Sequence, residues 1–280
     1  MAMHTLTLGF SPCPNDTFIF DALLQGKIDT EGLRFSPVIE DVEALNRRAF
    51  EGDIHLTKLS YHAFAQLTHR YALLHAGSAL GRGCGPLLIA RQPMAVEQIC
   101  ASRIAIPGRM TTANFLLSLA YPSAHDRVEM LFSDIEDAVL EGQVGAGLII
   151  HENRFTYAQR GLVQLLDLGQ HWEQTTGLPI PLGGIVVRRD LPEALQARVN
   201  RVLRRSVEYA FAHPESVMPF VRQHAQAMQD EVMRAHIDLY VTHYTVDLGE
   251  EGRQAVQAMF RLAEEKGVVQ GLEKNFFSPA

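Results

Sequence analysis

The fold is decided by the stretch TLTLGFSPCPNDTFIFDALL, residues 5–24. Its first part, Thr5–Phe10, is typical of a short β-strand, and a proline-punctuated turn follows at Ser11–Asn15. Apolar residues then recur at helical spacing through Asp16–Leu24. A strand, a turn and a helix in this order predict a βαβ unit, in which the next strand runs parallel to the first.

The same order of elements is repeated along the chain. In the first ninety residues the pattern predicts strands at Leu33–Val38 and Ile54–Thr57 and helices at Val42–Phe50 and Ser60–Leu67. A second set begins near Arg103, with predicted strands at Arg103–Ile106, Glu129–Phe132 and Ala146–Ile150 and helices at Thr112–Leu119 and Ser133–Leu140. One more strand, Ile185–Val187, precedes a tail, residues 192–266, that is expected to be almost entirely helical.

The helical tail has no sheet of its own, so we expect it to return and cover the first lobe. The predicted fold class is therefore α/β, with two lobes, a cleft between them and a double hinge crossing. Residues 1–92 and 185–280 are expected to form a large discontinuous α/β domain, and residues 93–184 a small inserted α/β domain.

Composition and charge narrow the range of functions. The formal net charge is −7 at pH 7, which argues against a nucleic-acid partner. The apolar runs are far shorter than the roughly 20 residues that cross a bilayer, and the start of the chain lacks the features of a signal peptide. Cys13, Cys84 and Cys100 are widely spaced, and no metal-ligand spacing is present. We therefore expect a cytoplasmic protein without a membrane or metal partner.

Two turns of the first lobe carry candidate binding residues. In open α/β sheets ligands bind at the carboxyl ends of the strands, where both turns are predicted to lie. Asn15 or Asp16 can cap the helix that follows the first strand. Lys58, Leu59 and Ser60 follow the third strand and offer an ammonium, backbone N–H groups and a capping hydroxyl. A rigid turn without a ligand and a solvated surface lysine remain the alternatives.

The segment Gly77–Pro86 is rich in glycine but lacks the sequence of a phosphate-binding loop, so no nucleotide site is predicted. Glycine permits close backbone approach, and a loop that includes Ser78 could lie against a ligand. The alternative is a connection that bends between strands. Cys84 in this loop is a weak candidate nucleophile, because no base is near it in the sequence.

The second lobe supplies a candidate base and an anion site. Thr111 and Thr112 open a predicted helix, and two hydroxyls at its positive end suit an anion, although ordinary capping explains one of them. His151 directly follows a buried strand, with Glu152 and Arg154 beside it. An imidazole at this position is the expected general base, which Glu152 could orient; a packed histidine is the alternative.

Five segments together carry a family likeness, and they cover most of the motifs described above. They are SPCPNDTFIF (11–20), TKLSYH (57–62), GSALGRGCGP (77–86), PGRMTT (107–112) and IIHENRFTY (149–157). In this combination and order the chain resembles the 1,4-dihydroxy-6-naphthoate synthase family of the futalosine route to menaquinone. The likeness extends from residue 5 to about residue 260.

This resemblance implies a periplasmic-binding-protein-like type II fold used as a cytosolic lyase on cyclic dehypoxanthinyl futalosine. It implies that His151 is the proton acceptor, and that Lys58, Leu59 and Ser60, with Thr111 and Thr112, contact the substrate. The implied reaction is a base-initiated elimination: a proton is removed next to the substrate ketone, the bond to the sugar-derived carbons breaks, and an aromatic naphthoate forms. No cofactor is implied.

Two other functions remain open. Chorismate dehydratase of the same pathway shares the fold and is also a cofactor-free eliminating lyase; the HENRFTY segment places it second. A non-catalytic cytosolic protein that binds a small organic acid would use the same cleft without a base. In each case we expect the partner to be a small anionic organic molecule, with Asn15, Asp16, Ser78 and Arg154 as further binding candidates.

Overall fold

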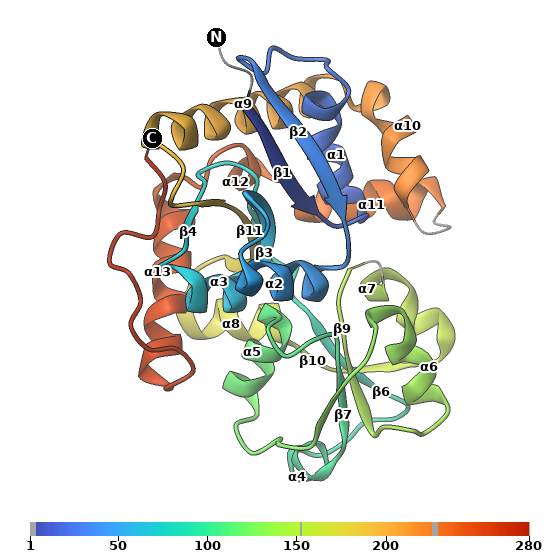
Figure 1. The fold of residues 1–280 in the computed structure, drawn as a ribbon. Helices are drawn as coiled ribbons and strands as arrows, with labels where there is room; N and C mark the ends of the chain where they lie inside the picture. Colours follow the sequence, from blue (N-terminus) through green and yellow to red (C-terminus); the bar gives the residue numbers. More distant parts are fainter. Residues whose placement is uncertain (1–3, 152, 226–228, 280) are drawn as a thin grey trace. The chain divides into compact units, whose positions relative to one another are not determined.

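A computed structural model describes residues 4–151, 153–225 and 229–279 (Figure 1). The chain divides into two compact units. Unit 1 consists of residues 1–81 and 181–280, and unit 2 of residues 82–180. Each unit is built around its own β-sheet.

The sheet of unit 1 has the strand order β2-β1-β3-β11-β4, and β5 pairs with β11. Its strands are β1 (His4–Phe10), β2 (Leu33–Ile39), β3 (Leu56–Ser60), β4 (Tyr71–Leu73), β5 (Ala79–Gly81) and β11 (Ile180–Arg188). Strand β1 is parallel to β2 and β3, whereas β11 is antiparallel to β3 and β4. The parallel part therefore comes from the first sixty residues, as the sequence predicts.

The helices of unit 1 come from both ends of the chain. They are α1 (Pro14–Leu24), α2 (Val42–Glu51), α3 (Tyr61–Leu67), α9 (Glu193–Ala212), α10 (Pro214–His224), α11 (Asp230–Tyr240), α12 (His243–Val246) and α13 (Gly249–Glu265). Helix α1 packs against α9, α10 and α11 (Figure 1). The buried hydroxyl of Ser206 on α9 donates to the carbonyl of Ile19 at 2.6 Å and accepts from the amide of Leu23 at 3.2 Å. The tail thus covers the first part of the chain, as predicted.

The sheet of unit 2 has the order β10-β6-β9-β7-β8. Its strands are β6 (Leu87–Ala90), β7 (Ile104–Ile106), β8 (Arg127–Glu129), β9 (Ala146–Ile149) and β10 (Val163–Asp167). Its helices are α4 (Val96–Ala101), α5 (Thr112–Ala120), α6 (Ile135–Leu140), α7 (Asn153–Thr156) and α8 (Leu168–Thr176), with 3-10 turns η1 (Phe132–Asp134) and η2 (Tyr157–Arg160). Strand β7 is parallel to β8 and β9, and β6 is antiparallel to β9 and β10.

The same change of winding direction occurs in both sheets. In unit 1 the chain passes from β1 to β2 on one side and then crosses to β3 on the other side of β1. In unit 2 it passes from β7 to β8 and then crosses to β9 on the other side of β7. Ligands of open α/β sheets bind at the carboxyl ends of the two strands where this reversal occurs. Those strands are β1 and β3 in unit 1, and β7 and β9 in unit 2.

Some boundaries differ from the sequence-based expectation. Strand β6 pairs with β9 and β10, so the units divide after residues 81 and 180, whereas the sequence suggested division after 92 and 184. The strand expected at Glu129–Phe132 is wrong in position: β8 ends at Glu129, and η1 begins at Phe132. The helix expected from Ser133 is consequently split between η1 and α6, and Asp134, at the N-cap of α6, makes no side-chain capping bond.

Strand β10 and helix α8 were not predicted. The buried large apolar side chains along residues 162–176 are Leu162, Leu168 and Trp172, so the apolar pattern of this stretch is weak. Among the described residues, no helix has both the length and the apolar character needed to cross a bilayer.

The core of unit 2 depends on close contact between α6 and β9. A methyl group placed on Gly147 of β9 would lie 2.5 Å from Cγ2 of Ile135 and 2.8 Å from Cγ2 of Val139. Both distances are too short for carbon atoms, and all three residues are buried. Only glycine at residue 147 therefore lets this helix pack at its present distance from the strand.

We expect Gly147→Ala to lower the free energy of unfolding by about 1–3 kcal/mol, because the new methyl overpacks the α6–β9 contact. Urea unfolding followed by circular dichroism measures this. The control is a double-mutant cycle with Ile135→Ala, which removes one of the clashing methyls, so the Gly147→Ala cost should be smaller in that background. Equal costs in both backgrounds would show that the contact does not limit the packing.

Candidate functional site

The N-cap of helix α1 lies two residues before Asn15, the earlier of the two expected caps. The N-cap is Cys13, which makes no side-chain capping bond, and Pro14 occupies the first helical position. Proline suits that position because it lacks an N–H group and has a helical φ. The expectation that Asn15 or Asp16 caps this helix is therefore wrong: both lie in its first turn, which leaves their side chains for other contacts.

The carboxylate of Asp16 is the centre of a buried network. Oδ2 accepts hydrogen bonds from the backbone amide of Ser11 at 3.2 Å and from the Ser11 hydroxyl at 2.7 Å. Oδ1 accepts from Nδ2 of Asn15 at 2.8 Å and from Nζ of Lys58 at 2.7 Å. Asp16 is 1% exposed, and the side chain of Lys58 is 8% exposed. The network joins the carboxyl ends of β1 and β3, and Lys58 balances the charge of Asp16.

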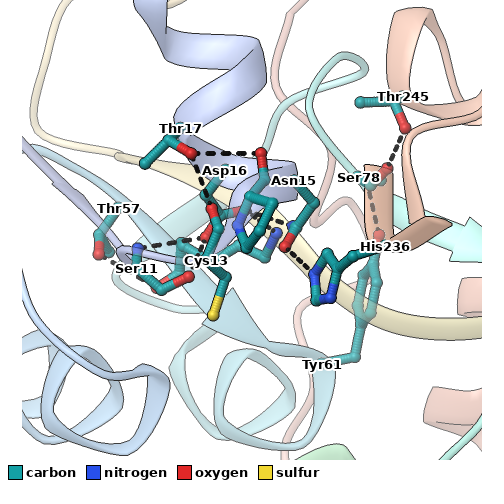
Figure 2. Close-up of polar contacts among 12 residues, drawn as sticks. Ser11, Cys13, Asn15, Asp16, Thr17, Thr57, Tyr61, Ser78, His236 and Thr245 are labelled. Atoms are coloured by element: carbon teal, nitrogen blue, oxygen red, sulfur yellow. Dashed lines mark hydrogen bonds and ion pairs between the residues drawn. The ribbon is translucent and has the colours of Figure 1, made fainter. Parts of the chain in front are cut away.

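A residue from the far end of the sequence completes this network. Figure 2 shows the ring of His236, from α11, next to Asn15. The distance from Nε2 of His236 to Oδ1 of Asn15 is 2.9 Å, and His236 is fully buried. Sequence reasoning missed this residue. The only available signal was that His236 shares a helix face with Met233, Ile237 and Tyr240, which made it a polar side chain on an apolar face.

Lys58, Leu59 and Ser60 lie within β3, so the expectation that they follow a strand ending at Thr57 is wrong. This part of β3 is also held from within unit 1. The hydroxyl of Ser60 caps α3 by accepting from the amide of Ala63 at 3.2 Å, as predicted. The side chain of Asn46 on α2 accepts from the Ser60 amide at 3.1 Å and donates to its hydroxyl at 3.2 Å. Leu59 is fully buried. A methyl on Gly183 of β11 would lie 2.9 Å from both Cε of Lys58 and the Leu59 carbonyl, so glycine leaves room for the lysine side chain.

Ser78 lies inside unit 1. Its hydroxyl is 2.9 Å from the hydroxyl of Tyr61, and its carbonyl accepts from the Thr245 hydroxyl at 2.9 Å (Figure 2). Ser78 and Tyr61 are completely buried. Burial raises the pKa of the Tyr61 phenol well above its usual range, so the phenol is protonated at neutral pH. A direct contact between Ser78 and a substrate would require the residues around this buried hydroxyl to move.

In unit 2 the first turn of α5 follows the carboxyl end of β7. Thr111 is its N-cap: the hydroxyl accepts from the amide of Asn114 at 3.2 Å and donates to the carbonyl of Gly108 at 2.8 Å. Thr112 is the first residue of the helix, and both threonines are 3% exposed. Capping therefore accounts for the Thr111 hydroxyl. Thr112 begins the helix itself, and a helix N-terminus is a position that suits an anion.

His151 follows the carboxyl end of β9 and has an unusual backbone conformation. Its φ is +59°, in the left-handed region that residues other than glycine adopt rarely. Among the described residues, Glu31 is the one other non-glycine residue with a positive φ. The His151 ring makes an edge contact with Phe132, with ring centroids 5.0 Å apart. Glu152, the predicted orienting carboxylate, lies outside the described residues.

The residues after His151 are anchored to the body of unit 2. Asn153 donates to Oε1 of Glu136 at 2.9 Å, and Arg160 donates to Oε2 of the same carboxylate at 2.8 Å. Glu136 is 1% exposed and lies on α6. A buried carboxylate with two donors from one short segment restricts where that segment can move. The strained turn at His151 is thus supported by contacts that follow it in the chain.

Arg154 makes contacts within unit 2. Its guanidinium donates to Oδ2 of Asp167 at 2.7 Å and to the carbonyl of Gly85. Oδ1 of Asp167 accepts from the amides of Gly169 and Gln170 and so caps α8. The side chain of Arg154 is 17% exposed. In this structure the arginine ties the His151 segment to the start of α8.

The glycine-dense loop packs against α8. A methyl on Gly85 would lie 2.2 Å from the Cα of Gly169, and the amide of Gly83 donates to Glu173 at 2.7 Å. Close helix packing therefore explains glycine at residue 85. Cys84 is 1% exposed, and burial raises the pKa of its thiol to about 12. The thiol is protonated at neutral pH, which argues against the nucleophile alternative.

A hollow at the opposite end of the unit 1 sheet has a different character. It lies beside the amino ends of β3 and β4 and is lined by Glu51, Gly52, His69, Arg70, Arg188, Arg189 and Asp190. Its arginines donate to backbone carbonyls, including those of Phe50, Thr68 and Gly52. These bonds satisfy backbone carbonyl groups at the C-terminal ends of α2 and α3. In parallel sheets this end is not where ligands bind.

In the part of the chain that the structure describes, no group of three or more His, Cys, Asp and Glu side chains is arranged to hold a metal ion. The candidate residues form two sets, one at each reversal of strand order. In unit 1 the set is Asn15, Asp16, Lys58, Leu59 and Ser60, with Ser78 buried nearby; in unit 2 it is Thr111, Thr112, His151 and Arg154.

Comparison with known proteins identifies the family. Residues 6–265 match the family model described as menaquinone biosynthesis. The chain belongs to this family. A relative from Thermus thermophilus, named 1,4-dihydroxy-6-naphtoate synthase, is 53% identical over 266 residues, which cover 95% of this chain and 96% of the relative. The resemblance seen in the sequence is thus confirmed at the level of the family.

Solved structures agree with the fold of the family. Protein AF1704 from Archaeoglobus fulgidus is 37% identical, with a TM-score of 0.90 over 96% of this chain and 100% of that chain. The periplasmic aliphatic sulphonate binding protein SsuA from Escherichia coli is 14% identical, with a TM-score of 0.66 over 100% of this chain and 94% of that chain. The second likeness concerns the fold alone, which is periplasmic-binding-protein-like, as predicted.

We expect Cys84 to resist alkylation, because its thiol is buried and protonated. With iodoacetamide at pH 8, Cys100, which is partly exposed, should be modified in the folded protein while Cys84 is not. Mass spectrometry of tryptic peptides measures this, and urea-unfolded protein is the control in which both react. Fast modification of Cys84 in the folded state would restore the nucleophile hypothesis.

Proposed function

We propose that the chain is a carbon–carbon lyase of menaquinone biosynthesis that converts cyclic dehypoxanthinyl futalosine to 1,4-dihydroxy-6-naphthoate. The observation that carries the proposal is the 53% identity, along 95% of the chain, to the relative named 1,4-dihydroxy-6-naphtoate synthase. Family membership over residues 6–265 places the protein in the same biosynthesis. The two sets of residues at the strand ends supply the groups that the reaction needs.

His151 is the proposed general base. The reaction begins with removal of a proton next to a ketone, and a side chain positioned within hydrogen-bond reach of that proton must accept it. His151 follows β9 at the reversal of strand order in unit 2, and its left-handed backbone is a strained conformation of the kind retained at functional sites. The edge contact with Phe132 restricts the ring.

The proposed recognition of the substrate carboxylate depends mainly on neutral donors. Lys58 is already paired with Asp16 at 2.7 Å, so much of its charge is compensated. The amino end of α5, where Thr112 is the first helical residue, carries the partial positive charge of the helix dipole. We therefore assign carboxylate binding to Thr112 and the α5 amides, and place the segment of Lys58, Leu59 and Ser60 against the remainder of the substrate.

Arg154 acts through His151 in this proposal. Its ion pair with Asp167 and its hydrogen bond to Gly85 fix the segment that follows the base. A rigid support is needed because a general base loses effect when it moves by about 1 Å from the reacting proton. Arg154 is thus a positioning residue rather than a direct substrate contact.

The test is an assay of the purified protein with cyclic dehypoxanthinyl futalosine, followed by mass spectrometry. Formation of 1,4-dihydroxy-6-naphthoate without an added cofactor supports the proposal. A parallel incubation with chorismate tests the dehydratase alternative, whose product is an enolpyruvyl-benzoate. Binding of either compound without turnover would instead indicate a protein that binds a small organic acid.

We expect His151→Asn to lower kcat by about 10²–10⁴ and to change substrate affinity by no more than a few fold. Asparagine removes the imidazole but tolerates a left-handed backbone, so the turn should persist. Steady-state kinetics and isothermal titration with the product measure the two effects. The control is His171→Asn, an exposed position on α8. Turnover near that of the wild type would transfer the role of base to another residue.

We expect Thr112→Val to weaken substrate binding about tenfold or more, because a hydrogen bond to a charged group contributes roughly 1.5–3 kcal/mol. The comparison is Thr111→Val, which removes the N-cap and should lower the free energy of unfolding by about 0.5–2 kcal/mol. Titration and urea unfolding of both variants separate the two roles. Unchanged affinity in Thr112→Val would exclude its hydroxyl from the site.

A further inference from the structure

We propose that His236 is a positioning residue for the reaction, acting through Asn15 on Asp16 and Lys58. This inference rests on the proposed function, in which the end of β3 contacts the substrate. The geometry that carries it is the contact of 2.9 Å between Nε2 of His236 and Oδ1 of Asn15, together with the contact of 2.8 Å between Nδ2 of Asn15 and Oδ1 of Asp16.

The direction of each hydrogen bond follows from its partners. A carboxylate oxygen can only accept, so the side of the Asn15 amide that touches Asp16 is its NH₂ group. The other side is then the amide oxygen, which also only accepts, so Nε2 of His236 must carry a proton and donate. If the Asn15 amide were reversed, its oxygen would face the carboxylate oxygen of Asp16, and two acceptors would be in contact. His236 and Asp16 therefore select the same orientation of Asn15.

The orientation of Asn15 influences the position of the Lys58 ammonium. Nδ2 of Asn15 and Nζ of Lys58 donate to the same oxygen, Oδ1 of Asp16, while Ser11 occupies Oδ2. If Asn15 turned away, Oδ1 would keep one donor, and Lys58 could shift to occupy both of its acceptor directions. A displacement of Nζ would change where the ammonium charge lies at the end of β3, next to the proposed substrate contacts.

Helix α11 holds the imidazole in place by packing. His236 lies on the buried face of α11 with Met233 and Ile237, and its ring is 4.6 Å from the ring of Tyr240, at 50°. Helix α11 packs against α1, which carries Asn15 and Asp16. An apolar side chain would fill this position without the desolvation cost of a histidine. The polar residue is explained by its donation to Asn15, which connects the tail to the site.

The experiment compares two substitutions in the full-length protein. His236→Phe keeps a ring but has no N–H group, whereas His236→Gln retains an amide that can donate to Asn15. In the naphthoate assay we expect kcat to fall about tenfold in His236→Phe and to recover at least in part in His236→Gln. The control is His224→Phe on α10, which loses a hydrogen bond to the Phe220 carbonyl away from the site and should leave kcat unchanged.

A second measurement does not depend on activity. The side-chain NH₂ resonances of Asn15, assigned by their loss in Asn15→Leu, should shift in His236→Phe and return toward their wild-type position in His236→Gln. Unchanged resonances in His236→Phe, or a lower melting temperature with wild-type kcat and KM, would overturn the proposal. If His236→Phe does not fold, the Asn15 resonances are compared in His236→Gln and His236→Asn, and this comparison decides whether the side chain at residue 236 orients the Asn15 amide. Absence of wild-type turnover would refute the proposed function, whereas the resonance test would still apply.

Discussion

A carboxylate that is 1% exposed must be surrounded by donors, because an isolated charge is strongly disfavoured away from water. Asp16 meets this requirement with two groups of Ser11, the amide of Asn15 and the ammonium of Lys58. These donors come from the turn after β1, from the first turn of α1 and from β3. The network therefore fixes the carboxyl ends of two neighbouring strands relative to each other, and the rest of the proposed unit 1 site depends on it.

The two sheets share one arrangement of strands. Each has three parallel strands with a reversal of order, followed by an antiparallel neighbour: β2-β1-β3-β11 in unit 1 and β8-β7-β9-β6 in unit 2. The side chains at each reversal differ, however. Unit 1 has a charge-balanced polar network, whereas unit 2 has a helix end and a histidine with a strained backbone. A shared topology thus carries two different kinds of chemistry.

An enzyme and a binding protein of the same fold differ in the side chains at the strand ends. The periplasmic sulphonate binding protein from Escherichia coli has a similar fold at 14% identity, and such a likeness says nothing about chemistry. Function depends on the side chains at the strand ends. In this chain His151 is held by a strained turn whose following residues bind Glu136 and Asp167, so an ionisable group is supported rigidly where a ligand-binding protein would need only donors.

Elements whose signals are local can be predicted from the order of residues alone. Spacing and turn chemistry predict the strand at residues 5–10, the body of the helix at residues 16–24, the cap at Ser60 and the position of His151 after a buried strand. The five motifs also identified the family before any comparison. These features concern neighbouring residues, whose side chains and backbone interact whatever the rest of the chain does.

Which of those residues come into contact depends on how the whole chain folds. Asp16 and Lys58 are 42 residues apart, and Asn15 and His236 are 221 apart, so no local pattern indicates either pair. Pairing of β6 with β9 and β10 moved the boundary of unit 2, and the contact of Gly85 with Gly169 explained glycine in a loop that had suggested a ligand. The physical reason is that burial and hydrogen-bond satisfaction are properties of packed surfaces, which form only when distant segments come together.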